Sequence, residues 1–267
     1  MSLIGSFVRF NQKCSKSLAN RFPEFFREQP PDYRVELLSR ILPAIENGSV
    51  RSVLEAGGID RPLLKKGGVF TYAGLDIESK ETCYEAYDEF IVQSIEAELK
   101  ERYDSIISIT LLEHVPDNRA SIASIYRGLN PGGQTHHYVP SKWHPYSVGL
   151  RVLGPNLQKK LIAWLWPEAT EIAGYPAYFD HCTVSAMKKL MLHQGFANVD
   201  VRPFYRANEY FAPFTPLFVM VTLFENLCQA LSWNVFASGF VVSAEVNGDS
   251  VTEASDRRPP NQRKQTD

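Results

Sequence analysis

Four positions in the first third of the chain have the types and spacing of a nucleoside-binding site. Glu55 ends a short apolar run, Gly57 and Gly58 follow it, and a second apolar run ends in Asp76. A glycine pair lets backbone N–H groups approach a ligand closely, and the carboxylate of Asp76 can accept hydrogen bonds from both ribose hydroxyls. Because a Gly-Gly turn alone is a weak signal, the interpretation depends on the surrounding strands and on the second carboxylate.

Histidines are the candidates for proton transfer, because their side chains titrate near neutral pH. His181 in YFDHC is the preferred general base, since it ends a long insertion and is expected to return toward the edge of the sheet. A structural or surface histidine is the alternative for this position, and His136, His137 and His144 are the other candidates. His136 and His137 are adjacent on an expected strand and would point to opposite faces, so we expect no metal site.

Alternating apolar runs and helical patterns predict an α/β chain that positions these residues. The expected strands are 52–56, 69–76, 89–93, 105–110, 134–139, 196–205 and 237–246. Residues 105–110, SIISIT, are too apolar for a strand with one wet face and favour a central parallel strand. Pro62 and the glycines at 67 and 68 predict a short helix between the first two strands, and further helices are expected at 79–87 and 183–194.

Four segments outside or within this unit have a different composition. Residues 1–50 predict a helical extension whose first helix is basic and aromatic, with packing on the domain or contact with a membrane surface as the alternatives. Residues 51–246 form the expected main domain, and within it residues 140–182 predict a long irregular insertion that covers a site. Residues 210–233 predict an apolar helix, buried, dimer-forming or in peripheral membrane contact, and residues 247–267 a disordered tail.

The order of four short motifs gives a family resemblance over about residues 53–140. VLEAGG, GLDIES, SIISITLLEHVPD and LNPGG occur in this order, and together they resemble the class I S-adenosylmethionine-dependent methyltransferases, in particular the broad group with an LEH motif. The resemblance implies a Rossmann-like seven-stranded methyltransferase sheet with six largely parallel strands and an antiparallel seventh. It also implies S-adenosylmethionine as the cofactor.

Carried over by position, the resemblance first assigns the two ends of the nucleoside-binding unit. Glu55 and Gly57, with Gly58 in the same turn, would border the methionine portion of the cofactor. Asp76 would hold the ribose. The family usually has a Gly-x-Gly turn, whereas Ile59 follows the glycine pair here, so the turn is shorter or displaced.

The resemblance assigns the remaining cofactor contacts to later loops. Ile77 and Ile95 would flank the adenine, and Ser94 stands where the family often has an acidic residue that reaches the adenine amino group. Thr110 and Leu111 would line the methionine side. For Ile77, Ile95 and Leu111, simple core packing is the alternative.

The resemblance therefore implies transfer of a methyl group to an O, N or C atom of a small acceptor. Here His181 is the expected base, while His114 of the LEH motif would shape the pocket wall behind Glu113. The altered glycine turn leaves open a second hypothesis, a catalytically degenerate binding or scaffold protein. A nicotinamide-dependent dehydrogenase ranks lower, because Arg61 and Leu63 occupy the region where a third glycine is required.

Aromatic residues suggest the character of the acceptor. Those of the insertion and its end are Trp143, Tyr146, Trp164, Trp166, Tyr175, Tyr178 and Phe179. They could wall a pocket for a hydrophobic or lipid-linked molecule, stack on a sugar, or form the core of the insertion.

The overall composition limits the partners and the compartment. A net charge of −2 and a pI of about 6.3 give no reason to expect a nucleic-acid partner. Four scattered cysteines without a CxxC pair, and an N-terminus without the apolar core of a signal peptide, favour the cytoplasm. A peripheral membrane location and a homodimer remain open.

Overall fold

The computed structural model describes residues 3–28, 32–59, 61–165 and 175–248. A seven-stranded sheet forms their centre, in the order β3-β2-β1-β4-β5-β7-β6. The strands are β1 (Ser52–Ala56), β2 (Thr71–Asp76), β3 (Glu89–Val92), β4 (Tyr103–Ile109), β5 (Leu129–Pro140), β6 (Ala197–Phe204) and β7 (Gly239–Glu245). β1 to β5 pair in parallel, and β7 pairs antiparallel with both β5 and β6. The predicted sheet with an antiparallel seventh strand is confirmed.

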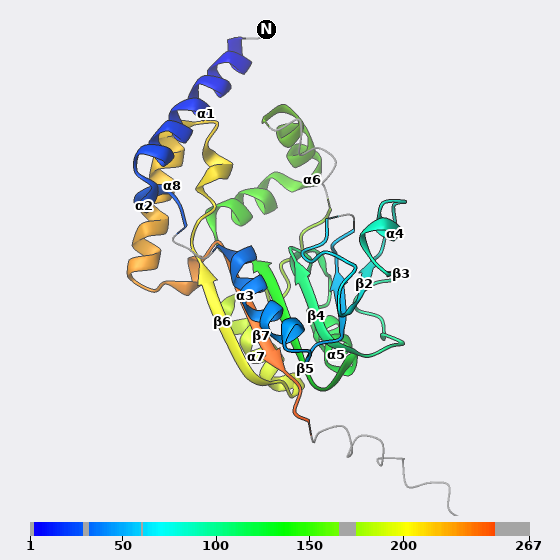
Figure 1. Ribbon diagram of the computed structural model, residues 1–267. Helices are drawn as coiled ribbons and strands as arrows, with labels where there is room; N and C mark the ends of the chain where they lie inside the picture. Colours follow the sequence, from blue (N-terminus) through cyan, green and yellow to red (C-terminus); the bar gives the residue numbers. More distant parts are fainter. Residues whose placement is uncertain (1–2, 29–31, 60, 166–174, 249–267) are drawn as a thin grey trace, which may run out of the picture.

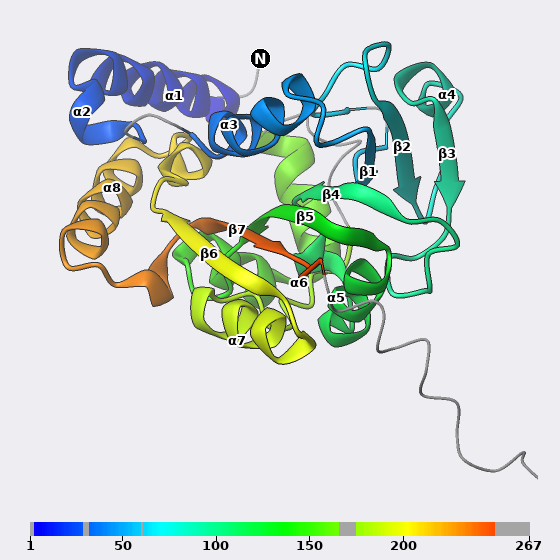
Figure 2. The ribbon, with the colours of Figure 1, turned by 60° about the horizontal axis from the view of Figure 1, so that its bottom comes forward.

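Helices cover both faces of the sheet, as a largely parallel sheet requires. α3 (Tyr33–Glu46) lies on one face, while α5 (Asn118–Arg127) and α7 (Val184–Gln194) lie on the other (Figure 2). Aspartates begin two of these helices, because the side chains of Asp32 and Asp117 accept hydrogen bonds from the backbone N–H groups of the first turn. α7 ends at Gly195, whose φ of 107° allows the left-handed turn predicted there.

The connection between β1 and β2 differs from the prediction, because described residues 61–70 contain no helix. The stretch between Pro62 and Gly67 offers little more than one turn, which does not offset the cost of helix nucleation. The backbone N–H groups of Leu63 and Leu64 instead donate to the side chains of Glu55 and Tyr72. The predicted helix at 79–87 is also shorter, and α4 covers only Cys83–Ala86.

The insertion at 140–182 was predicted to be irregular, and this was wrong for its first half. α6 covers Pro145–Leu165, with a non-helical residue, Gly154, inside it. Pro145 occupies the first helical position, where its missing N–H costs nothing and its fixed φ suits the helix. The side chain of Trp164, residue Trp166 and residues 249–267 of the predicted tail lie outside the described residues.

Two N-terminal helices pack against a helix from the C-terminal part of the chain. α1 (Leu3–Arg21) and α2 (Pro23–Phe26) lie along α8 (Thr215–Ala230), which the short 3-10 helices η3 (Asn208–Phe211) and η4 (Asn234–Phe236) flank (Figure 1). These helices and α6 lie on the side toward which the arrows of β5 and β6 point. None of the helices in the described part of the chain is long and apolar enough to cross a membrane.

Candidate active site at the carboxyl edge of the sheet

The turn after β1 needs both of its glycines for packing within the protein. Gly57 has a φ of 82° and donates its N–H to the carbonyl of Leu75 at 2.8 Å. A Cβ at Gly57 would lie 2.9 Å from the side chain of Leu111, and a Cβ at Gly58 would lie 2.2 Å from the hydroxyl of Tyr87. The turn is therefore held directly against the loop that follows β4.

Glu55 lies at the carboxyl end of β1, but its carboxylate is directed into the core. The residue is 1% exposed, and Oε2 accepts hydrogen bonds from the hydroxyl of Tyr72 and, at 2.9 Å, from the N–H of Leu63. Burial raises the pKa of Glu55 to about 7, although both hydrogen bonds act in the opposite direction. The carboxylate thus fixes the 61–70 loop, and its predicted place beside the methionine portion stays a prediction.

Asp76 presents a carboxylate at the carboxyl end of β2. It is half-buried, and it accepts hydrogen bonds from the backbone N–H groups of Glu78, at 3.2 Å, and Ile77. Burial raises the pKa of Asp76 despite these two donors. A carboxylate has about four acceptor positions, so two ribose hydroxyls can still be accommodated. The side chain of Ile77 beside it is 61% exposed and offers an apolar surface to a base.

The loop after β3 contains a carboxylate that the sequence analysis did not consider. Ser94 donates its hydroxyl to Oε2 of Glu96 at 3.0 Å, and Oε1 of Glu96 accepts from the N–H of Asp117. Position 94 itself has no acidic side chain, but an acidic side chain, Glu96, lies two residues later and bonds to Ser94. Ile95 is 3% exposed and packs in the main core. This agrees with core packing, which was the alternative to contact with the adenine.

The loop after β4 begins with a residue in an unusual backbone conformation. Thr110 is exposed and has a φ of 52°, which is rare and costly for a β-branched residue and is often found at functional sites. Its N–H donates to the carbonyl of Tyr138 at 3.1 Å. This conformation turns the chain so that Leu111 packs over Gly57.

Glu113 is the group in this region whose surroundings are most unusual. It lies in η1 (Leu112–His114), is 4% exposed, and its Oε2 has no hydrogen-bond partner among the described residues. Burial raises the pKa of Glu113 to about 8. His114 lies beside it, with Nε2 3.6 Å from Oε1 of Glu113 and Nδ1 2.9 Å from the carbonyl oxygen of Pro176. Burial lowers the pKa of His114, which favours its neutral form.

The end of the insertion lies across these loops. Tyr175 donates its hydroxyl to Glu78 at 2.9 Å, just after β2. The backbone N–H groups of Tyr178 and Phe179 donate to the carbonyl of Glu113 at 2.8 and 3.0 Å. This segment therefore joins the loop beside Asp76 to the loop that contains Glu113.

The structure pairs the predicted base His181 with its sequence neighbour. Nδ1 of His181 lies 2.8 Å from Oδ1 of Asp180, while Oδ2 of Asp180 accepts from the N–H of Asn118 at the start of α5. His181 itself has a φ of 52°. Its imidazole is thus placed by contacts that support the first turn of α5.

The other candidate histidines are buried. His137 contacts the hydroxyl of Ser108 at 2.7 Å and His136 that of Ser243 at 2.8 Å. Burial lowers the pKa of His136 to about 4 and of His137 to about 3, so both are neutral near pH 7. His144 contacts Glu225 at 3.2 Å. In the described ranges, no group of three or more acidic, histidine or cysteine side chains could hold a metal ion.

Four tyrosines from four elements gather near Glu113. Tyr33 of α3 stacks on Tyr138 at the end of β5 with ring centroids 3.9 Å apart, and Tyr146 of α6 stacks on Tyr210 of η3 at 3.8 Å. Burial raises the pKa of Tyr138, Tyr146 and Tyr210, and the nearby Glu113 carboxyl adds to this effect. We call these four residues the tyrosine cluster. Of the four, only Tyr146 was predicted from the sequence as a possible pocket residue.

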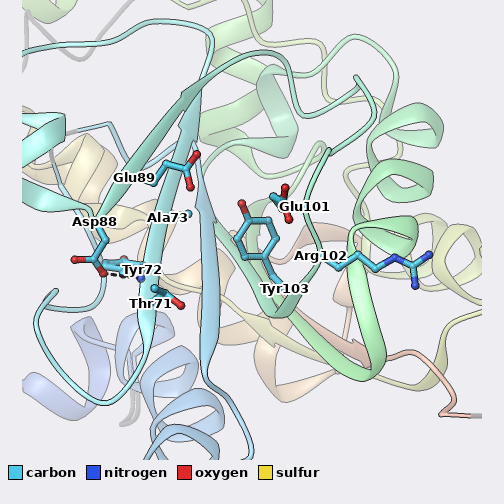
Figure 3. A pocket seen from close by; sticks show the side chains of 8 residues that line it. All are labelled: Thr71, Tyr72, Ala73, Asp88, Glu89, Glu101, Arg102 and Tyr103. Carbon is cyan, nitrogen blue, oxygen red and sulfur yellow. Dashed lines mark hydrogen bonds between the residues drawn. The ribbon is translucent and has the colours of Figure 1, made fainter.

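A pocket at the opposite edge of the sheet is a poor alternative. It has a volume of about 330 Å³ and is lined by Thr71, Tyr72, Ala73, Asp88, Glu89, Glu101, Arg102 and Tyr103 (Figure 3). These residues lie at or just before the amino ends of β2, β3 and β4. Ligands of open parallel sheets bind beyond the carboxyl ends of the strands, where Asp76, Thr110 and Glu113 lie.

The fold defines an α/β protein with carboxylates, Asp76 and Glu113, at the carboxyl edge of its sheet. A family model described as "Methyltransferase domain" matches residues 25–201. Because this match covers more than half of the 267 residues, the chain belongs to this family. The resemblance to the class I S-adenosylmethionine-dependent methyltransferases is thereby confirmed.

Individual relatives are more distant. Two ubiquinone biosynthesis O-methyltransferases, from Pseudomonas entomophila and Pseudomonas putida, are each 29% identical, over 90 and 76 residues respectively. These segments cover 34% and 28% of this chain. They cover 35% and 32% of the relatives, so the match spans about a third of the length of these relatives.

Similar solved structures include an S-adenosylmethionine-dependent methyltransferase from Archaeoglobus fulgidus. It is 14% identical with a TM-score of 0.49, over 79% of this chain and 92% of that one. Phosphoethanolamine N-methyltransferase 2 from Haemonchus contortus, in complex with S-adenosyl-L-methionine, is 11% identical with a TM-score of 0.46, over 78% and 52% of the two chains.

Proposed function

We propose that this chain transfers a methyl group from S-adenosylmethionine to a hydroxyl of a small, aromatic or otherwise apolar acceptor. One observation carries the proposal. A half-buried carboxylate with free acceptor positions, Asp76, and a buried carboxyl whose Oε2 has no hydrogen-bond partner among the described residues, Glu113, lie at the same edge of a methyltransferase sheet. The first suits a ribose, and the second suits an acceptor that must lose a proton.

The residues at this edge fit the cofactor that the family implies. Asp76 would hold the ribose hydroxyls, Ile77 would cover one face of the adenine, and the turn at Gly57 would border the methionine portion. The sulfonium of the cofactor supplies an activated methyl group. The protein's contribution is to hold donor and acceptor in line at short distance.

Glu113 is the group we propose to remove the acceptor proton. With a pKa of about 8, a fraction of its side chains is deprotonated at neutral pH, and such a pKa suits general base catalysis. The bound cofactor would supply the methyl group for the acceptor oxygen, and Oε2 of Glu113 would accept the proton that the acceptor hydroxyl loses. His114 would position the carboxyl through its contact with Oε1.

The tyrosine cluster supports an acceptor with an aromatic or otherwise apolar body. Stacked tyrosine rings offer apolar surface and a few hydrogen-bonding groups, which is typical of small-molecule sites. The names of the Pseudomonas relatives, ubiquinone biosynthesis O-methyltransferases, agree with a hydroxyl acceptor.

The four cysteines Cys14, Cys83, Cys182 and Cys228 are free thiols, which supports the proposed cytoplasmic location.

Calorimetric titration with S-adenosylmethionine and S-adenosylhomocysteine tests the cofactor site. Asp76→Ala should weaken binding by about 1.5 to 3 kcal/mol, the range for hydrogen bonds to a charged group. Glu101→Ala is the matched control, because this exposed carboxylate lies at the opposite edge of the sheet. Absence of binding at millimolar cofactor would refute the proposal, and equal affinities of wild type and a folded Asp76→Ala variant would refute the role of Asp76.

A non-catalytic cofactor-binding protein is the second candidate function. It is favoured by the missing helix between β1 and β2 and by the use of the Glu55 carboxylate inside the core. Formation of S-adenosylhomocysteine with a panel of phenolic acceptors distinguishes the two functions. Tight binding of S-adenosylmethionine with no turnover on any acceptor would favour the non-catalytic protein.

A further inference from the structure

The side of α1 that faces the protein is mixed. Asn11 and Ser15 are buried, and Val8 and Leu18 on the same side are half-buried. Oδ1 of Asn11 accepts from the N–H of Thr215 at 3.0 Å, and the hydroxyl of Ser15 donates to the carbonyl of Ala212 at 3.0 Å. The exposed side of a helix on a globular protein is normally polar. Exposed phenylalanines on α1 therefore require an explanation.

Two phenylalanines of α1 are exposed, and one of them lies beside a phenylalanine at the start of α8. Phe7 and Phe10 are 54% and 66% exposed, and the ring of Phe7 lies 6.5 Å from that of the exposed Phe214. On α8, exposed large side chains recur at helical spacing. We call this surface the apolar face, and its main residues are Phe7, Phe10, Phe214, Met220, Leu223 and Leu227.

The two parts of the apolar face meet at Phe7 and Phe214. α1 and α8 contact each other directly, and in Figure 1 the lower end of α1 lies beside the upper end of α8. Monomeric proteins rarely expose large contiguous apolar patches, and such patches mark sites of contact with proteins or membranes.

The charges on α1 distinguish between these two partners. α1 contains Arg9, Lys13, Lys16 and Arg21 and no acidic residue, in a chain with a net charge of −2. At about 100° per residue, Arg21 projects between Phe7 and Phe10, and Lys13 lies beside Phe10. Cations that flank an apolar stripe are typical of helices that lie in the interface of anionic membranes.

A second copy of this chain fits the same surface less well. A symmetric interface through the apolar face would bring two copies of the α1 cations close together, and like charges in contact repel. Anionic lipid headgroups would neutralise those cations while the acyl boundary covers the phenylalanines.

We propose that the apolar face docks on an anionic membrane surface, with α1 lying in the plane of the lipid headgroups. α6 lies at the same end of the sheet as α1 and α8. The docked apolar face would therefore be at the same end of the protein as the candidate site. The proposal does not rest on methyl transfer, because docking requires neither cofactor nor acceptor.

Sedimentation of the full chain with vesicles tests the proposal. The chain should bind vesicles of phosphatidylcholine mixed with phosphatidylglycerol, and bind phosphatidylcholine alone more weakly. Raised salt should weaken binding, since it screens exposed charges. The double variant Phe7→Ser with Phe10→Ser should lose at least about tenfold in partitioning, from the apolar area that no longer enters the interface.

Two further variants separate the apolar and the electrostatic contributions. Lys13→Gln with Arg21→Gln should remove most of the preference for anionic vesicles, and it leaves the phenylalanines in place. Val69→Ser is the matched control, because Val69 is 62% exposed on the β1–β2 connection. It should bind like wild type.

Two results would overturn the proposal. The first is failure of the folded wild-type chain to sediment with either kind of vesicle at low salt. The second is a wild-type dimer that binds no vesicles and that Phe7→Ser with Phe10→Ser converts to a monomer. The apolar face would then be an interface between copies of the chain.

Discussion

Replacement of Glu113 by glutamine tests the unusual state of this carboxyl without knowledge of the acceptor. Glutamine has nearly the same shape and cannot ionise. In the native protein burial raises the pKa of Glu113 to about 8 from its ordinary value of 4.5. The native state therefore binds this proton more tightly than the unfolded state. The resulting loss of stability begins as pH rises above about 4.5 and is complete above about 8.

The two pKa values set the size of the effect. At 1.36 kcal/mol for each pH unit between them, the full effect is about 5 kcal/mol, of which about 4 kcal/mol develops between pH 5 and pH 9. The free energy of unfolding of Glu113→Gln should thus rise relative to wild type by about this amount across that range. Groups that do not interact with Glu113 titrate equally in both proteins and cancel in the difference, while the tyrosines coupled to Glu113 have raised pKa values and stay neutral across this range.

Urea unfolding at pH 5, 7 and 9, followed by circular dichroism, measures the difference. Glu101→Gln is the control, because the exposed Glu101 should give a constant offset from wild type. A difference between wild type and Glu113→Gln that stays constant from pH 5 to pH 9 would show that Glu113 does not hold a proton in the native state. A raised pKa would then no longer support its role as the base.

Two further predictions concern the turn after β1. Gly57→Ala should cost about 1 to 3 kcal/mol of stability, because Gly57 has a φ of 82° and its new Cβ would lie 2.9 Å from Leu111. The contacting atom is the Cβ of Leu111, so adding Leu111→Gly should relieve the contact but not the backbone strain. Urea unfolding should then show that Gly57→Ala costs less in the Leu111→Gly background than in the wild-type background, and an equal cost in both would contradict the contact. Tyr72→Phe should cost about 1 to 3 kcal/mol, since the buried carboxylate of Glu55 loses a hydrogen-bond donor. Thermal and urea unfolding measure this cost, and a Tyr72→Phe variant as stable as wild type would show that the bond contributes nothing.

Much of the fold was predictable because its signals are local. A parallel strand buried on both faces needs a short apolar run, and SIISIT has one, as does the segment that ends in Asp76. Helix starts and stops were also visible, for example at Gly195. The prediction failed in two places for opposite reasons. Pro62 was taken as a helix start in a stretch too short for a helix, and the predicted irregular insertion contains α6, which begins at Pro145.

The site was predictable only where position along a strand decides it. Asp76 and Thr110 lie at the carboxyl edge because each follows a parallel strand. The importance of Glu113 was not visible, since its raised pKa arises from burial by residues distant in sequence. One signal could have found it, namely an acidic residue within the apolar run LLEHV.

The sequence by itself determined the class of this protein. The order of its strands, the positions of its turn glycines and carboxylates, and the cations of α1 are all properties of short segments. Tertiary structure alone decided what these residues do. It turned the Glu55 carboxylate inward onto Tyr72, closed the turn at Gly57 under Leu111, and gathered tyrosines from four elements. These outcomes depend on contacts between residues far apart in the chain, and no local pattern specifies such contacts.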